Sequence, residues 1–145
     1  MVPTLAGRVQ TRLFVLASAG AIVTAVITPF IGIASSPGGA YEAAYAILAT
    51  IAVIGIIWEL IYHLLMQWRW EKDWPALFGL VSGAWEGAAV WLLLAAHVVP
   101  GISTTPPLPA YLLDFIVVWL CAWLATQGPM RVPFIRWRFR GGRLV

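Results

Sequence analysis

Residues 45–66 read YAILATIAVIGIIWELIYHLLM, an apolar run interrupted by the ionisable side chains of Glu59 and His63. The hydrocarbon core of a bilayer is about 30 Å thick, and roughly 20 apolar residues of α-helix cross it. Similar runs occupy residues 13–33, 76–98 and 111–127. The sequence therefore predicts an all-α polytopic membrane protein with one domain over residues 1–145, in which four transmembrane helices form an antiparallel bundle and a short basic tail covers 128–145.

The composition excludes a single soluble globular domain. Hydrophobic residues make up 61% of the chain and charged residues 10%, and the mean hydropathy is +0.87. Cys121 is the single cysteine, which excludes a disulfide framework or a thiolate metal cluster within the chain. It lies in an apolar run without a candidate base, so we expect it to be a core residue.

The basic residues indicate the orientation of the four spans. All nine Lys and Arg lie before the first span, between the second and third, or after the fourth: Arg8, Arg12, Arg69, Lys72, Arg131, Arg136, Arg138, Arg140 and Arg143. Because cytoplasmic loops retain positive charge, we expect both termini in the cytoplasm. The Arg-rich, Asn-free composition is typical of a high-GC bacterial genome, so the expected location is the bacterial cytoplasmic membrane. Anionic lipid headgroups, and not nucleic acid, are the expected partners of basic residues beside apolar spans.

Small residues predict where the helices approach one another most closely. Transmembrane helices associate through close backbone contact and interhelical hydrogen bonds, because lipid is as apolar as the side chains it meets. Gly79, Gly83 and Gly87 recur at four-residue spacing in the third span. We expect this glycine face to pack against another helix of the same chain, although the same pattern also serves contacts between copies.

Three ionisable side chains in the second and third spans are candidates for ion or proton binding. Glu59 and Glu86 are equally far in sequence from the midpoint of the loop between Lys72 and Asp73, so they should lie at similar depth. His63 follows Glu59 by four residues and shares its helical face. Two carboxylates in a low dielectric do not both stay ionised cheaply, so one should bind a proton, a cation or protonated His63.

This predicted cluster has three interpretations. It is either a buried polar network that fixes the helix register or a proton relay. A metal site is the third interpretation, for which one copy has too few ligands, whereas two copies of Glu59, His63 and Glu86 would supply the four carboxylates and two histidines of a di-iron site. The i,i+4 spacing of Glu59 and His63 differs from the i,i+3 spacing of that site type. The sequence therefore leaves the metal and any other cofactor open.

Two further ionisable residues lie near the opposite end of the spans. His97 ends the third span and Asp114 lies early in the fourth, so the two can form a polar pair across the short proline-rich loop. The alternative is that Asp114 is stabilised by the helix dipole alone.

The tail alternates arginine with aromatic residues and contains two prolines. We expect an extended strip on the membrane surface, with Trp137 and Phe139 inserted and the arginines on lipid phosphates. A partner subunit is the alternative binding target. The candidate lipid- or partner-binding residues are Arg136, Trp137, Arg138, Arg140 and Arg143.

No nucleotide-binding, hydrolase or metalloprotease motif is present, and the segments outside the spans are too short for a separate catalytic domain. The first hypothesis is an accessory or structural subunit of a larger membrane assembly, which would contact a membrane protein partner or further copies of itself. The second is a small proton-coupled or ion-conducting transporter that uses Glu59, His63 and Glu86. An enzyme built on the same three residues is the third.

Overall fold

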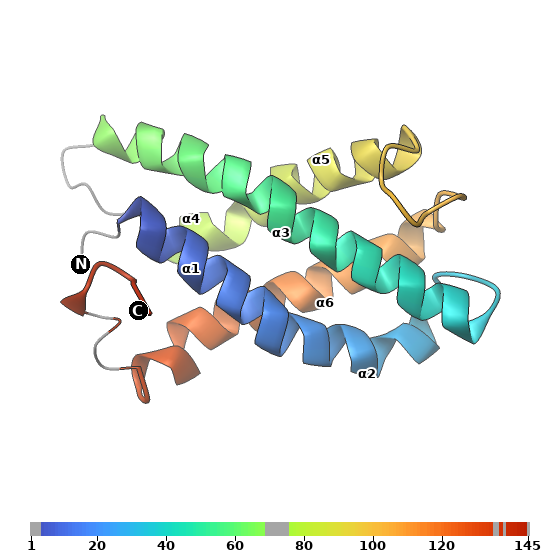
Figure 1. Cartoon of the computed structure of the whole chain (residues 1–145), viewed down its shortest axis with the longest axis horizontal. Helices are drawn as coiled ribbons and strands as arrows, with labels where there is room; N and C mark the ends of the chain where they lie inside the picture. Colours follow the sequence, from blue (N-terminus) through green and yellow to red (C-terminus); the bar gives the residue numbers. More distant parts are fainter. Residues whose placement is uncertain (1–3, 69–75, 135–136, 138, 145) are drawn as a thin grey trace.

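The structure is a computed structural model of the chain, and it describes residues 4–68, 76–134, 137 and 139–144. These residues form helices and loops, with no β-strand among them. The elements are α1 (Leu5–Val15), the π-helical η1 (Leu16–Gly20), α2 (Ala21–Ile31), α3 (Pro37–Gln67), α4 (Ala76–Val81), α5 (Gly83–Ala95), α6 (Leu108–Gln127) and the 3-10 helix η2 (Pro129–Arg131). Both termini lie at the same end of the bundle (Figure 1), which we call the terminal end.

Four helical stretches are long and apolar enough to cross a membrane: Leu5–Ile31, Pro37–Gln67, Leu77–Ala95 and Leu108–Arg131. Successive stretches run in opposite directions along the bundle (Figure 1). The predicted fold class, an all-α antiparallel bundle of four transmembrane helices, is therefore confirmed. In this bundle α2 packs against α3 and α6, and α3 packs against α5.

The first span begins earlier in the sequence than expected. Thr4 caps α1, because its side-chain oxygen accepts a hydrogen bond from the backbone N–H of Gly7 at 3.1 Å. The helix therefore starts at Leu5 and not near residue 13. This correction places Arg8 and Arg12 within the spanning helix, although the hydropathy pattern puts both in front of it.

Pro29 lies inside α2 without ending it. Proline has no N–H, so the carbonyl of Ala25, four residues earlier, loses its partner within the helix. The hydroxyl of Tyr41 on α3 donates to that carbonyl at 3.2 Å, and the hydroxyl of Tyr45 donates to the carbonyl of Ala21 at 3.0 Å. The first two spans are thus joined by hydrogen bonds to the backbone in the half opposite the terminal end.

The glycine face of α5 packs against an aromatic face of α6. A Cβ on Gly83 would lie 2.5 Å from Nε1 of Trp119, and one on Gly87 would lie 2.8 Å from the ring of Phe115. The hydroxyl of Tyr111 donates to the backbone carbonyl of Gly87 at 2.6 Å. Any larger residue at Gly83 or Gly87 would displace an aromatic ring, so these glycines set the spacing of α5 and α6 within one chain.

The third span is not one continuous helix. A turn at Ser82 separates α4 from α5, and the Ser82 hydroxyl donates to the carbonyl of Gly79 at 3.0 Å. The indole N–H of Trp119 donates to the carbonyl of Leu80 at 3.2 Å. Gly79 makes looser contact, since a Cβ there would lie 3.9 Å from the ring of Trp123.

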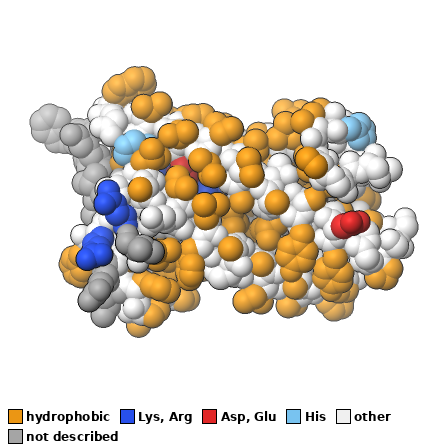
Figure 2. Space-filling view, viewed as in Figure 1, with side chains coloured by type: hydrophobic (Ala, Val, Ile, Leu, Met, Phe, Trp, Pro, Cys, Tyr) orange, Lys and Arg blue, Asp and Glu red, His pale blue; other side chains and the backbone are white. Residues whose placement is uncertain are grey.

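A continuous apolar core fills the half of the bundle that lies away from the terminal end. Its fully buried side chains include Ile47, Val90, Leu94, Tyr111 and Val118. Hydrophobic side chains are spread along the whole visible exterior, while arginine side chains appear at the terminal end (Figure 2). This distribution is the one required of a protein whose middle contacts lipid.

The tail folds back onto α1 and does not extend as a strip. A Cβ on Gly7 would clash with the backbone of Gly141 and Gly142, and both of these glycines have a positive φ. The backbone N–H of Thr4 donates to the carbonyl of Gly141 at 2.8 Å. The indole N–H of Trp137 donates to the Thr11 hydroxyl at 2.7 Å. The extended strip was predicted from the tail sequence alone. That sequence gives no sign of the hydrogen bonds with Thr4 and Thr11 at the start of the chain.

Three other tail residues that were predicted to lie on the membrane surface are exposed in the structure. Phe139 is 81% exposed, and Arg140 is also exposed. Arg143 is exposed, and its Nε donates to the Thr4 hydroxyl at 3.4 Å. Arg136 and Arg138 lie outside the described residues.

Candidate functional site

An arginine of the first span lies between the two intramembrane glutamates. Arg12 donates from Nη1 to Oε1 of Glu59 at 3.1 Å and from Nη2 to Oε2 of Glu86. The exposed fractions of the Arg12, Glu59 and Glu86 side chains are 9%, 12% and 3%. One guanidinium therefore links α1, α3 and α5 inside the bundle.

The position of Arg12 depends on a gap in α3. A Cβ on Gly55 would lie 2.5 Å from Cζ of Arg12 and 2.8 Å from its Nη2. Gly55 therefore leaves the space that the guanidinium fills, one helical turn before Glu59. On the opposite side, Cζ of Arg12 lies 5.3 Å from the ring centroid of Trp119, which is within cation–π range.

A second arginine, Arg8, balances the negative charge that Arg12 alone leaves on Glu59 and Glu86. Nε of Arg8 donates to Oε2 of Glu59 at 2.6 Å, and the exposed fraction of the Arg8 side chain is 13%. We call Arg8, Arg12, Glu59 and Glu86 the Arg–Glu cluster. Its two positive and two negative charges sum to zero, which matches the requirement that charges in a low dielectric be paired.

Aromatic side chains complete the hydrogen bonding of Glu86. The hydroxyl of Tyr62 donates to Oε1 of Glu86 at 3.0 Å, and the indole N–H of Trp85 donates to the Tyr62 oxygen at 2.6 Å. The ring of Trp58 stacks on that of Tyr62 with centroids 5.8 Å apart. These contacts fix the depth of Glu86 relative to α3.

The structure does not bring His63 into contact with either carboxylate. His63 and Gln67 share a hydrogen bond of 3.3 Å on the same helix, and Nδ1 of His63 is buried without a partner among the described residues. Glu59 and Glu86 both bind the guanidinium of Arg12, which lies between them. Arg12 was not predicted to join them, because the apolar run begins at Leu13 and Arg12 precedes it.

The expected pair of His97 and Asp114 is not formed. His97 is exposed, lies beyond the end of α5 and has a left-handed φ of 56°. Asp114 is buried on α6 with 1% exposure, and its Oδ1 has no hydrogen-bond partner among the described residues. Cys121 on the same helix is half-buried and has a free thiol.

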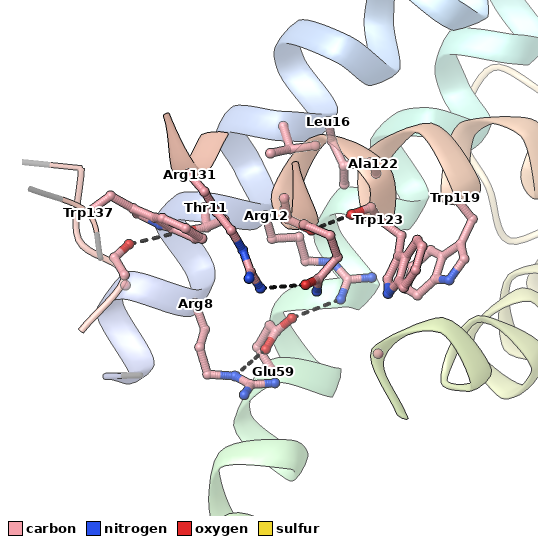
Figure 3. A pocket seen from close by; sticks show the side chains of 16 residues that line it. Arg8, Thr11, Arg12, Leu16, Glu59, Trp119, Ala122, Trp123, Arg131 and Trp137 are labelled. Carbon is pink, nitrogen blue, oxygen red and sulfur yellow. Dashed lines mark hydrogen bonds and ion pairs between the residues drawn. The ribbon is translucent and has the colours of Figure 1, made fainter. Parts of the chain in front are cut away.

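A cavity of about 290 Å³ opens beside the Arg–Glu cluster at the terminal end (Figure 3). Side chains of Arg8, Arg12 and Glu59 line one part of it. Val15, Leu16, Trp119, Ala122 and Trp123 form its apolar walls, and Thr11, Thr126, Gln127, Arg131 and Trp137 complete the lining toward the tail.

Within the described ranges, no group of three or more His, Cys, Asp or Glu side chains is arranged to hold a metal ion. No protein-family model, no curated protein and no solved structure matches the chain.

Proposed function

We propose that this chain is an accessory or structural subunit of a larger membrane assembly. The observation that carries the proposal is the position of Arg12 between Glu59 and Glu86. A buried network of this kind specifies which helices meet and in what register. Its role would be to hold three spans in one arrangement that presents a defined apolar exterior.

The charge balance of the Arg–Glu cluster supports this role over a proton relay. A relay needs a carboxylate that gains and loses its proton during transport, whereas each carboxylate here is matched by a guanidinium. Arginine is not deprotonated in proteins, so it does not pass a proton on.

The exposed apolar surface of the bundle also supports a role as a subunit. Large apolar side chains on the outward faces of α3, α4 and α5 are exposed. Such a surface fits contact with other transmembrane helices as well as with lipid. The exposed residues of this kind include Val53, Ile57, Leu64, Leu77, Val81 and Leu92.

The test is the size of the particle that contains the chain in its native membrane. After mild solubilisation and native gel electrophoresis, we expect a discrete complex that contains a partner in fixed ratio. Migration as a monomer after chemical cross-linking in intact membranes would contradict the proposal. Reporter fusions at both termini test the associated orientation, in which both should report the cytoplasm of a bacterial cell.

A small proton-coupled or ion-conducting transporter is the second candidate, because the cavity reaches Arg12 and Glu59. In proteoliposomes, a transporter should move protons or ions without another protein. Glu59→Gln and Glu86→Gln should then abolish that movement while the fold is retained. Proton-tight vesicles with the wild-type chain would exclude proton movement by the chain alone.

A further inference from the structure

The cavity at the terminal end has two kinds of wall. Arg8 and Arg12 reach it from α1, and Arg131 reaches it from η2 after the last span (Figure 3). The facing walls are apolar and include Leu16 and Ala122. A charged group and an apolar group can therefore be accommodated side by side.

The cavity carries a net positive charge. Three arginines line it, and two carboxylates, Glu59 in the lining and Glu86 behind Arg12, offset two of them, which leaves one positive charge. Of these three arginines, Arg131 has no ion pair with a described residue, and its Nη2 donates to the neutral Oε1 of Gln127 at 2.5 Å.

The arginines also retain hydrogen-bond donors. Within the described part of the chain, the side chain of Arg8 donates through Nε alone, and that of Arg131 through Nη2. A guanidinium has five N–H donors in a planar fork, and this fork matches the oxygens of a phosphate group. The unused donors border a space that also has apolar walls.

We propose that this cavity binds a phosphate group, held by Arg131 and Arg8. A volume of about 290 Å³ lies at the lower end of the range for small-molecule sites, which fits a phosphate with a short attached group. The apolar wall formed by Leu16 and Ala122 would contact the part of the ligand that follows the phosphate. Either an anionic phospholipid headgroup or a free phosphate compound can supply this chemistry.

The experiment uses the purified full chain in dodecyl maltoside with two probes. Native mass spectrometry measures binding of phosphatidylglycerol against phosphatidylcholine with the same acyl chains, and calorimetry measures binding of inorganic phosphate. The test variant is Arg131→Gln. Arg140→Gln is the comparison variant that measures attraction at the surface, because Arg140 is an exposed arginine of the same tail that does not line the cavity.

We expect the wild-type chain to bind at least one probe, and Arg131→Gln to weaken that binding about tenfold, the effect of losing one hydrogen bond to a charged group. Arg140→Gln should weaken it clearly less than Arg131→Gln does, because Arg140 does not line the cavity. Ala122→Phe, which fills the cavity without changing charge, should also weaken binding. Circular dichroism verifies that each variant is folded.

The two probes distinguish the sources of the phosphate. Preference for phosphatidylglycerol with no uptake of inorganic phosphate assigns the site to a lipid headgroup, and uptake of inorganic phosphate assigns it to a free anion. Equal losses in Arg131→Gln and Arg140→Gln would show surface attraction alone and would overturn the proposal. The absence of binding by both probes would overturn it as well.

Discussion

Removal of the Arg12 guanidinium is the most direct test of the Arg–Glu cluster. Arg12→Met keeps an unbranched stem and deletes the charge that Glu59 and Glu86 share. The cluster then holds one positive and two negative charges, with Glu86 only 3% exposed. Breaking a buried ion pair by removing one partner typically costs about 3–5 kcal/mol, and we expect a loss of that size in the free energy of unfolding.

The assay is equilibrium unfolding in mixed micelles, followed by far-ultraviolet circular dichroism. Arg140→Met is the matched control, because that exposed arginine should change stability by no more than about 0.5 kcal/mol. Adding Glu86→Gln to Arg12→Met restores a neutral cluster of Arg8 and Glu59. The double variant should therefore be more stable than Arg12→Met, with a coupling energy of about 1–3 kcal/mol. Additive losses in the double variant, or a wild-type stability for Arg12→Met, would refute the reasoning.

Three further variants test other contacts. Gly83→Leu should separate α5 from Trp119 and lower the free energy of unfolding by about 1–3 kcal/mol, the usual cost of overpacking; unchanged thermal stability would contradict this. Glu86→Ala removes the acceptor of the Tyr62 hydroxyl and should cost more than Glu86→Gln, which keeps one; equal stabilities in chemical denaturation would argue against the role of that hydrogen bond. Asp114→Asn should raise the free energy of unfolding, because it removes a buried negative charge that has no cationic partner among the described residues; a lower stability in the same assay would show that the charge is needed.

The sequence predicts the overall architecture because bilayer thickness leaves few alternatives. Apolar runs of sufficient length identify four spans, and one helical stretch in the structure overlaps each of them. Glu59 and Glu86 lie equally far in sequence from the loop midpoint, which predicts a common depth, and both pair with Arg12 in the structure. These features depend on distance along a helix, which the sequence specifies directly at about 1.5 Å per residue.

Arg12 illustrates what the sequence does not specify. The hydropathy pattern begins at Leu13, so the preceding arginine resembles an interface residue that only determines orientation. Its burial needs the Thr4 cap, which extends the helix toward the terminus, and the space left by Gly55 on another helix. The available signal was charge balance: two glutamates deep in neighbouring spans require a nearby cation.

The tail was harder to predict, because its partners lie more than 120 positions away in sequence. Trp137 and Thr11 are separated by 126 positions, and Gly141 and Thr4 by 137. The alternation of arginine and aromatic residues favours a surface strip when the tail is considered alone. Side-chain hydroxyls on α1 provide hydrogen bonds that compete with that arrangement.

Glu86 and Asp114 are both buried carboxylates, yet their surroundings differ because the loops at the end opposite the termini contain no Lys or Arg. Arg12 starts at the terminal end and reaches Glu86, whereas residues 34–44 and 99–110, which connect the spans at the opposite end, contain no Lys or Arg. The charge asymmetry that predicts the orientation therefore also determines which buried carboxylate has a cationic partner. Glu86 therefore helps to hold the bundle together through its ion pair with Arg12. A charged Asp114 would need a positive group from outside the described residues.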